Sequence, residues 1–297
     1  MYLSTSLDPF FKHYAPKDAI AMLKEAGFTA LDYSFFNYPT HAPDMEEHYR
    51  AIRSYAEENG ILFNQAHAPF PSSRGVPEQD ADILQNIVRS MKYASLLGIP
   101  RIVVHPVQHL TYADPGVPEK LFEMNLVFYN RLKPYCEEYG IQVALENMWQ
   151  GKTLVGRSDM RIIPSTCSSP AEFIRYLDAL DSPCFTACLD LGHTMLVHED
   201  TSDFIRALGH DRLKALHVHD TDGARDLHTL PYYGGMGYWD RIAKALADID
   251  YTGDVTFECG NFISPLPEKL YPAGARFMAA VGNQLIAMIE ENKRKNA

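Results

Sequence analysis

Short apolar runs alternate with longer amphipathic segments along the whole chain. Each short run is rich in aliphatic and β-branched residues, which predicts a buried strand. The longer segments carry apolar residues at helical spacing, and Gly27, Gly60, Gly98 and Gly140 each follow one of them as C-terminal stops. The predicted strands are residues 2–7, 28–33, 61–67, 101–105, 141–146, 185–190, 214–219 and 254–258.

A predicted helix follows every predicted strand. The helices are 18–26, 44–59, 81–97, 119–139, 170–180, a segment from Thr201 to near Leu208, 238–249 and 274–293. Eight β-then-α units predict an α/β fold of the single (β/α)8 TIM barrel type. A doubly wound open sheet is the alternative, but it normally has its chemistry at one crevice. No linker or low-complexity tract breaks the pattern, which predicts one domain over residues 1–297.

The composition fits a globular enzyme better than a membrane or nucleic-acid-binding protein. A hydrophobic fraction of 46% is ordinary for a sizeable core, and no apolar run has the length of a membrane helix. The N-terminus has no basic-then-apolar signal, and the five cysteines form no Cys-x-x-Cys pair, so we expect reduced thiols in a cytoplasmic protein. The net charge of −11 argues against a nucleic-acid partner.

Histidine or carboxylate side chains end six of the eight predicted strands. They are His67, His105, Glu146, Asp190, His217 or His219, and Glu258. These positions belong to the barrel face where TIM-barrel active sites lie. Each residue alone has a structural explanation, such as a helix cap or a salt bridge. Because all six agree in position and chemical type, the sequence predicts a site for a divalent metal such as zinc or manganese.

Further ligand-type residues cluster after the sixth and seventh strands. His217 and His219 are two residues apart on one strand, so both side chains point the same way and either could be the ligand. His193 follows the sixth strand, and Asp226 and His228 lie in the loop after the seventh. The residue types and positions therefore allow more than one metal ion.

Several motifs resemble those of the xylose-isomerase-like barrels, which include sugar isomerases, sugar epimerases and the AP endonuclease family 2 (endonuclease IV). The motifs are Ala144-Leu-Glu-Asn147, Leu189-Asp-Leu-Gly-His193, His217-Val-His-Asp220, Asp226-Leu-His228 and Glu258. The resemblance covers nearly the whole chain. It implies one divalent ion, Mn²⁺ or Zn²⁺, held by Glu146, Asp190, His217 or His219, and Glu258.

The same resemblance implies a reaction and roles for individual residues. It is the isomerisation or epimerisation of a sugar, sugar phosphate or cyclitol, by proton abstraction next to a carbonyl through a metal-stabilised enediolate. Glu146 and Glu258 would be the acid/base pair, with His193 and Arg225 binding the carbohydrate. Lys152 stands where ketose 3-epimerases of this group have a second glutamate, which argues against a free ketohexose as substrate.

Two other interpretations remain open beside the isomerase. The ligand types match a trinuclear zinc endonuclease IV site with up to three Zn²⁺; the matching set is His67, His105, Glu146, Asp190, His193, His217, Asp226, His228 and Glu258. Against this, Asn-Met-Trp-Gln follows Glu146, and Asp190-Leu-Gly-His replaces the Asp-Thr-Cys-His of the nucleases. A sugar lyase or dehydratase, which starts with the same proton abstraction, is the other interpretation.

Several side chains are expected to add to the site or to an interface. His67, His105, His193, His219, Arg225, Asp226 and His228 are candidates for substrate binding or additional metal ions. Phe70, Trp149, Tyr232 and Tyr233 are candidates to cover an apolar sugar face. The long final helix and the aromatic loop after the seventh strand suggest a homo-oligomer.

Overall fold

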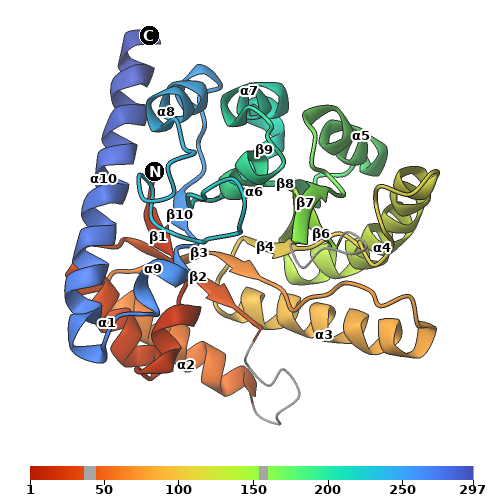
Figure 1. Cartoon of the computed structure of the whole chain (residues 1–297). Coiled ribbons are helices and arrows are strands. Elements are labelled where there is room, and N and C mark those ends of the chain that lie inside the picture. Colours follow the sequence, from red (N-terminus) through yellow and green to blue (C-terminus); the bar gives the residue numbers. More distant parts are fainter. Residues whose placement is uncertain (37–44, 154–159, 297) are drawn as a thin grey trace.

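Parallel strands close into a ring in the computed structural model, which describes residues 1–36, 45–153 and 160–296 (Figure 1). One six-stranded sheet has the order β2-β3-β4-β5-β8-β9, and β1 pairs with β10. The ring strands are β1 Leu3–Thr5, β2 Ala30–Ser34, β3 Leu62–His67, β4 Arg101–Val104, β5 Gln142–Glu146, β8 Phe185–Asp190, β9 Leu213–His217 and β10 Val255–Phe257.

Two isolated bridges join the pair to the larger sheet and complete the barrel. Ser6 bridges Asp32 of β2, and Val218 bridges Phe257 of β10, both in parallel. The Val218 amide donates to the Thr256 carbonyl at 2.9 Å. An open sheet would leave two edge strands with unpaired backbone groups. The closed ring confirms the predicted (β/α)8 barrel and excludes the open-sheet alternative.

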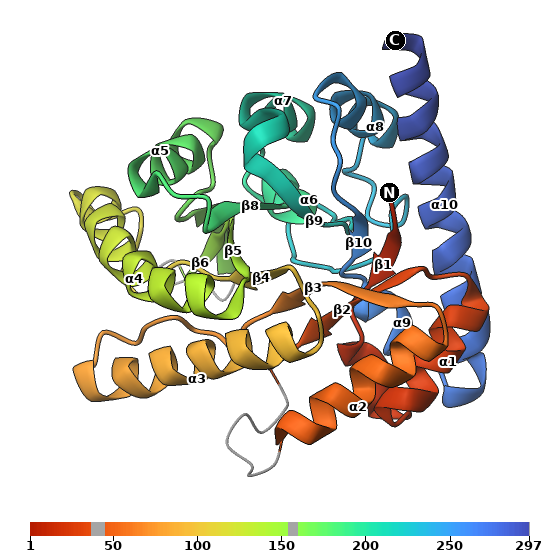
Figure 2. The ribbon, with the colours of Figure 1, turned by 180° about the vertical axis from the view of Figure 1, so that it is seen from behind.

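Helices form the outer layer around the strands, as Figure 2 shows from behind. The long helices are α1 Pro16–Ala26, α2 Met45–Glu58, α3 Pro77–Leu96, α4 Val117–Tyr139, α5 Pro170–Leu180, α7 Thr201–Arg212, α8 Trp239–Asp248 and α10 Tyr271–Asn296. Shorter elements are η1 Asp8–Lys12, α6 Leu191–Leu196, α9 Gly260–Ile263 and η2 Glu268–Leu270. The predicted helix start at Asp44 lies outside the described residues.

Four helices, α1, α3, α4 and α10, begin earlier than apolar spacing predicts, and a proline explains the first three. Proline occupies N1 or N2 of α1, α3 and α4. Its fixed φ suits the first helical turn, where its missing N–H would have no partner in any case. Helix α1 ends at Gly27, whose φ of 108° is a conformation that favours glycine. The apolar pattern therefore found the elements, while proline sets several of their starts.

A hairpin between β5 and α5 was not predicted. Strands β6 (Trp149–Thr153) and β7 (Met160–Pro164) pair antiparallel, with Trp149 opposite Pro164. The hairpin follows Glu146 directly, so it rises from the face of the barrel where β5 ends. This placement brings Trp149 and Gln150 to the rim of the candidate site described below.

The barrel interior contains one small apolar layer directly beneath the candidate site. Val103, Ala144, Cys188 and Ala215 form a buried cluster of their own, separate from the larger core between strands and helices. The residues two positions further along these strands are His105, Glu146, Asp190 and His217. Side chains two apart on a strand share a direction. The site is therefore the next layer of the barrel interior.

Two features of the structure concern the expected environment of the chain: its helices and its cysteines. None of the helices in the described part of the chain combines the length and apolar character that crossing a bilayer requires. All five cysteines are free thiols, and four of them are buried. The cytoplasmic location and the single-domain boundary stay predictions.

Candidate metal centre

Four ligand-type side chains converge at the carboxyl ends of neighbouring strands. Glu146, Asp190 and His217 end β5, β8 and β9, and Glu258 directly follows β10. We call these four residues the central group; one ligand atom from each lies within 4.8 Å of all the others. His217 Nδ1 is 3.0 Å from Glu146 Oε1, 3.4 Å from Glu258 Oε2 and 3.9 Å from Asp190 Oδ2. Distant parts of the sequence thus supply one compact set of donors.

The two histidines of the seventh predicted strand have different surroundings. His217 belongs to the central group, whereas His219 belongs to a second set of donors. His219 Nε2 is 3.0 Å from Asp190 Oδ1 and 3.9 Å from Asp226 Oδ1. The sequence left both residues open as the metal ligand, and this geometry favours His217.

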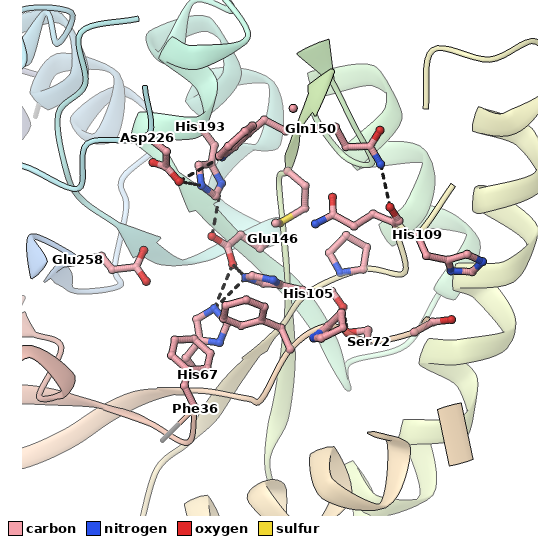
Figure 3. Close-up of a pocket in the computed structure, with 18 of the residues that line it drawn as sticks. Phe36, His67, Ser72, His105, His109, Glu146, Gln150, His193, Asp226 and Glu258 are labelled. Atoms are coloured by element: carbon pink, nitrogen blue, oxygen red, sulfur yellow. Dashed lines mark hydrogen bonds and ion pairs between the residues drawn. The ribbon is translucent and has the colours of Figure 1, made fainter. Parts of the chain in front are cut away.

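A second set lies beside the central group, and we call it the flanking group. It consists of His193, His219, Asp226 and His228. Asp226 Oδ2 is 3.1 Å from His228 Nε2 and 3.4 Å from His193 Nε2 (Figure 3). The Trp149 indole N–H also donates to this oxygen at 3.2 Å. The hairpin is thereby joined to the flanking group.

His67 and His105 stand on the opposite oxygen of Glu146. Glu146 Oε2 is 3.5 Å from His67 Nε2 and 3.0 Å from His105 Nε2 (Figure 3). The two imidazole Nε2 atoms are 3.0 Å apart. Because Glu146 Oε1 faces His217 instead, this carboxylate lies between the central group and the histidine pair. Glu146 and His217 both belong to the central group and to a set with His67.

Backbone carbonyls orient several of these imidazoles. Nδ1 donates to the carbonyl of the next or a nearby residue in His67 (2.8 Å to Ala68), His193 (2.8 Å to Asn147) and His228 (3.1 Å to Glu258). A neutral ring that donates through Nδ1 has its lone pair on Nε2. That atom faces the carboxylates or the neighbouring imidazole in each case. Such fixing of the tautomer is typical of metal-binding histidines.

Burial and neighbouring charge act in opposite directions on the carboxylates. Burial raises the pKa of Glu146, but nearby His217 and His105 outweigh it and hold the pKa well below its usual range. Asp190 and Asp226 follow the same rule, since burial raises the pKa of each while His193, with a second histidine, lowers it below the ordinary value. The carboxylates are therefore ionised at neutral pH.

The histidines compensate this negative charge by holding protons. Burial lowers the pKa of His217, but the acidic groups around it, Cys188 and Glu258 first, raise the pKa well above its usual value. Asp190 and Asp226 do the same to His193, and Glu258 and Asp226 raise the pKa of His228 to about 9. A divalent cation offers the same compensation without protons.

Two buried carboxylate oxygens test whether the donors fit a cation. Glu146 Oε2 and Asp226 Oδ1 have no hydrogen-bond partner, although histidine nitrogens lie near both. A buried acceptor without a partner costs free energy, and a metal ion would remove that cost. Carboxylate oxygens and imidazole nitrogens are ligands of Zn²⁺ and Mn²⁺. The residues present therefore fit a divalent metal.

A cavity of about 820 Å³ opens above the donors. Phe70 and Trp149 line it. Phe36, Glu146, His193 and Glu258 line it as well (Figure 3). The Glu258 side chain is 22% exposed, whereas that of Glu146 is 1% exposed. A small molecule in this cavity would therefore reach the donors from one side only.

Some predicted site residues lie elsewhere. The Arg225 side chain is 74% exposed and pairs with Asp222 at 2.6 Å, and it does not line the cavity. Tyr232 and Tyr233 are also exposed and outside the lining, while Phe70 and Trp149 belong to it. Substrate binding by Arg225 stays a prediction.

Sequence reasoning missed one residue that holds two others in place. The buried Asn147 amide donates to the Asp190 carbonyl at 2.9 Å and accepts from the Asp190 N–H at 2.7 Å. The Asn147 carbonyl accepts from His193 Nδ1. The sequence signal for Asn147 is its position directly after Glu146 in the motif Ala144-Leu-Glu-Asn147.

A TIM barrel with carboxylates and imidazoles at the carboxyl ends of its strands is the class that this geometry defines. The family model described as xylose isomerase-like TIM barrel (AP endonuclease 2) matches residues 20–281. The chain belongs to this family, as the motifs indicated.

Individual relatives are more distant. The protein y4fM of Sinorhizobium fredii is 25% identical over 296 residues, covering 91% of this chain and 89% of the relative. A probable endonuclease 4 of Bacillus cytotoxicus is 30% identical over 220 residues, covering 70% of this chain and 68% of the relative. A D-tagatose 3-epimerase-like protein has a similar structure, with a TM-score of 0.74, 18% identity, and coverage of 98% and 99%.

Proposed function

We propose that this chain is a divalent-metal-dependent isomerase or epimerase of a sugar, sugar phosphate or cyclitol. The observation that carries the proposal is the central group, whose donors converge from four neighbouring strands and two of whose members, Glu146 and Glu258, line a cavity. The fold shared with the D-tagatose 3-epimerase-like protein supports the same class. Glu146, Asp190, His217 and Glu258 would hold one ion, Mn²⁺ or Zn²⁺.

The cation and the two glutamates would have separate tasks. A divalent ion held here supplies Lewis-acid polarisation of a substrate carbonyl, which makes the neighbouring C–H more acidic. Glu146 and Glu258 are the acid/base pair in this proposal, because both carboxylates reach the cavity and flank His217. One removes the proton from carbon and the other returns a proton. Positioned groups of this kind contribute about 10²–10⁴-fold each.

The remaining imidazoles would bind and orient the substrate. His193 and His228 line the cavity beside Glu146 and Glu258. Their fixed rings offer nitrogen atoms at set positions, which suits hydroxyl groups of a carbohydrate. Glu146 is buried, so a carbon atom bound against its carboxylate would be shielded from bulk water on that side. Glu258 is more exposed and can exchange protons with solvent.

Solvent exchange tests the proposal directly. The Mn²⁺- or Zn²⁺-loaded protein is incubated with sugars, sugar phosphates and cyclitols in deuterated water, and label at carbon is measured by NMR. We expect deuterium at one carbon-bound position with at least one compound. Exchange should fall by roughly 10²-fold or more in Glu146→Gln and in Glu258→Gln, and remain unchanged in the surface variant Glu268→Gln. Retained exchange in both site variants would remove these glutamates from the mechanism.

The flanking group favours a second candidate, a metal-dependent phosphodiesterase like the endonuclease 4 relatives. Its donors, and the pair His67 and His105 on Glu146, could hold further ions, giving up to three Zn²⁺. Metal analysis of the loaded protein separates the two candidates when it is combined with assays on abasic-site DNA. Three ions per chain with DNA nicking would favour the nuclease, and one ion with sugar exchange would favour the isomerase.

A further inference from the structure

The cavity extends well beyond the donors of the central group. Figure 3 shows Glu258 at one end and His109 at the other, with Glu146 between them. The volume of about 820 Å³ lies in the upper part of the range, about 300–1,000 Å³, of pockets that enclose drug-sized ligands. One sugar ring bound at Glu146 and Glu258 would leave the outer half, toward His109, without an occupant.

An aromatic side chain is exposed at the start of this outer half. Phe70 lines the cavity and is 55% exposed, which is high for a large apolar side chain in a folded protein. Its ring stacks on His105 with centroids 5.0 Å apart and meets Phe36 edge-on at 4.7 Å. Because His105 contacts Glu146, the Phe70 face lies one ring away from the central group. It offers apolar surface to whatever is joined to a bound sugar.

Gln150 and Ser72 of the outer half are already engaged, while His109 Nδ1 is buried without a hydrogen-bond partner. The Gln150 amide donates to the carbonyls of Gln108 and Leu110, both at 2.8 Å, and its oxygen accepts from the Tyr112 N–H at 2.9 Å. Ser72 Oγ donates to the His105 carbonyl. A second sugar ring would need several free donors and acceptors here. With Gln150 and Ser72 engaged and His109 offering one nitrogen, the wall beside Pro71, Pro106 and Met148 instead suits an apolar group.

We propose that the outer half of the cavity binds a planar apolar substituent, so that the substrates are aryl-substituted sugars that keep a carbonyl, such as aryl glycosides in which one ring carbon is a ketone. The proposal rests on the proposed function for the sugar half of the site. The substituent stacks on Phe70 while the sugar ring meets Glu146 and Glu258. Phe70 is thus a specificity-determining residue that makes no contact with the reacting carbon.

A phosphate is the competing occupant of the outer half. Arg74 lines the cavity at its rim, but its side chain is exposed and it is the one lysine or arginine among the described lining residues. Phosphate sites normally combine several charged or backbone donors. The nearby Asp80 carboxylate accepts from the Arg74 N–H and from Ser73 Oγ, so two donors beside the rim already bind a negative charge.

Calorimetric titration with matched probes tests the proposal. The Mn²⁺-loaded protein is titrated with phenyl and methyl β-glycosides of D-glucose, D-galactose and D-xylose, and with the 6-phosphates of glucose and galactose. We expect at least one phenyl glycoside to bind about tenfold more tightly than its methyl partner, the size of one aromatic contact. Phe70→Ala should remove this preference, while Phe70→Tyr keeps it. Tyr233→Ala, an exposed aromatic outside the cavity, is the matched control.

Each result decides for or against the substituent. No phenyl preference in any pair, or a preference that survives in Phe70→Ala, would overturn the proposal. Tighter binding of a sugar 6-phosphate that is lost in Arg74→Ala would replace it with an anion site. Failure of the proposed function has a different signature, because loss of deuterium exchange leaves the phenyl preference and its dependence on Phe70 unchanged.

Discussion

The central and flanking groups contain the same kinds of side chain but are held in different ways. Three members of the central group end barrel strands, so backbone register fixes their spacing: Glu146 pairs with Cys188, and Asp190 pairs with His217. In the flanking group, His193 belongs to the short helix α6, and Asp226 and His228 lie in the loop after β9. The difference indicates that the barrel strands position the residues of the proposed reaction. The helix and loop that carry the flanking group instead determine which molecules can bind.

Electrostatics sharpen the contrast between the two groups. The central group has three carboxylates and one imidazole, whereas the flanking group has one carboxylate and three imidazoles. Without a cation the central group must take protons, and His217 has the raised pKa that this requires. The flanking group can balance its single Asp226 with one protonated histidine. A divalent ion should therefore bind more tightly to the central group than to the flanking group.

Asp190→Asn should have the largest effect. It removes one of three negative charges from the central group, while an asparagine can still cap α6 as Asp190 does through the His193 N–H at 2.7 Å. We expect deuterium exchange to fall by about 10³–10⁴-fold, in the range of a lost acid/base system. Metal content, measured by plasma mass spectrometry, should fall with it. The exposed Asp203→Asn is the control, and near-normal metal content in Asp190→Asn would contradict the assignment.

Asn147→Ala should weaken both groups together. It leaves the buried Asp190 N–H and carbonyl without their side-chain partner, which costs about 1–3 kcal/mol of unfolding free energy. The same change loosens Asp190 and the neighbouring His193, so metal affinity at both groups should fall. Denaturant unfolding of the metal-free protein and a metal titration measure the two effects. Loss of stability with unchanged metal affinity would make Asn147 structural only.

Asp226→Asn should affect the flanking group alone. The substitution keeps the shape and one oxygen for the Trp149 indole N–H, but removes the only carboxylate of that group. We expect the central ion to remain and sugar exchange to fall by roughly tenfold, as for a lost charged hydrogen-bond partner of a substrate. Asp222→Asn, a surface carboxylate in the same loop, is the control. A loss of all bound metal would show that the groups are not independent.

The pH dependence of stability should change sign when metal binds. This effect should be smaller than those of the three substitutions. His228 has its pKa raised to about 9, above the ordinary 6.5, so its contribution to stability is complete below about 6.5 and disappears as pH rises through 9. Metal-free protein should therefore melt at a lower temperature at pH 9.5 than at pH 6.5, since the carboxylates are ionised at both pH values. Metal competes with these protons, so metal affinity should rise with pH. Parallel melting curves with and without metal test this sign.

Residue pattern alone predicted the barrel and the gathering of carboxylates and imidazoles at the carboxyl ends of its strands, and the motif resemblance then implied the four residues of the central group. Period-two spacing along strands and the common face of parallel strand ends place Glu146, Asp190 and His217 together. Only the choice between His217 and His219 needed coordinates. Both point to the same face, and the position of Asp226 decides which donors each one meets.

The walls of the cavity could be predicted only in part: Phe70 and Trp149 were candidates and do line it, but the contacts that position them were not predicted. The hairpin β6–β7 and the orientation of Phe70 depend on contacts between loops that are far apart in sequence, such as Trp149 with Asp226. The motif resemblance implies that Arg225 binds the substrate; its side chain pairs with Asp222 at the surface, and its role stays a prediction. Periodicity carries no signal for these contacts.

Anomalous diffraction from crystals containing Mn²⁺ tests the central claim most directly. The account predicts a peak within about 2.0–2.3 Å of an oxygen or nitrogen from each of Glu146, Asp190, His217 and Glu258. A peak confined to His193, Asp226 and His228, or no peak between the four central residues at saturating metal, would contradict it.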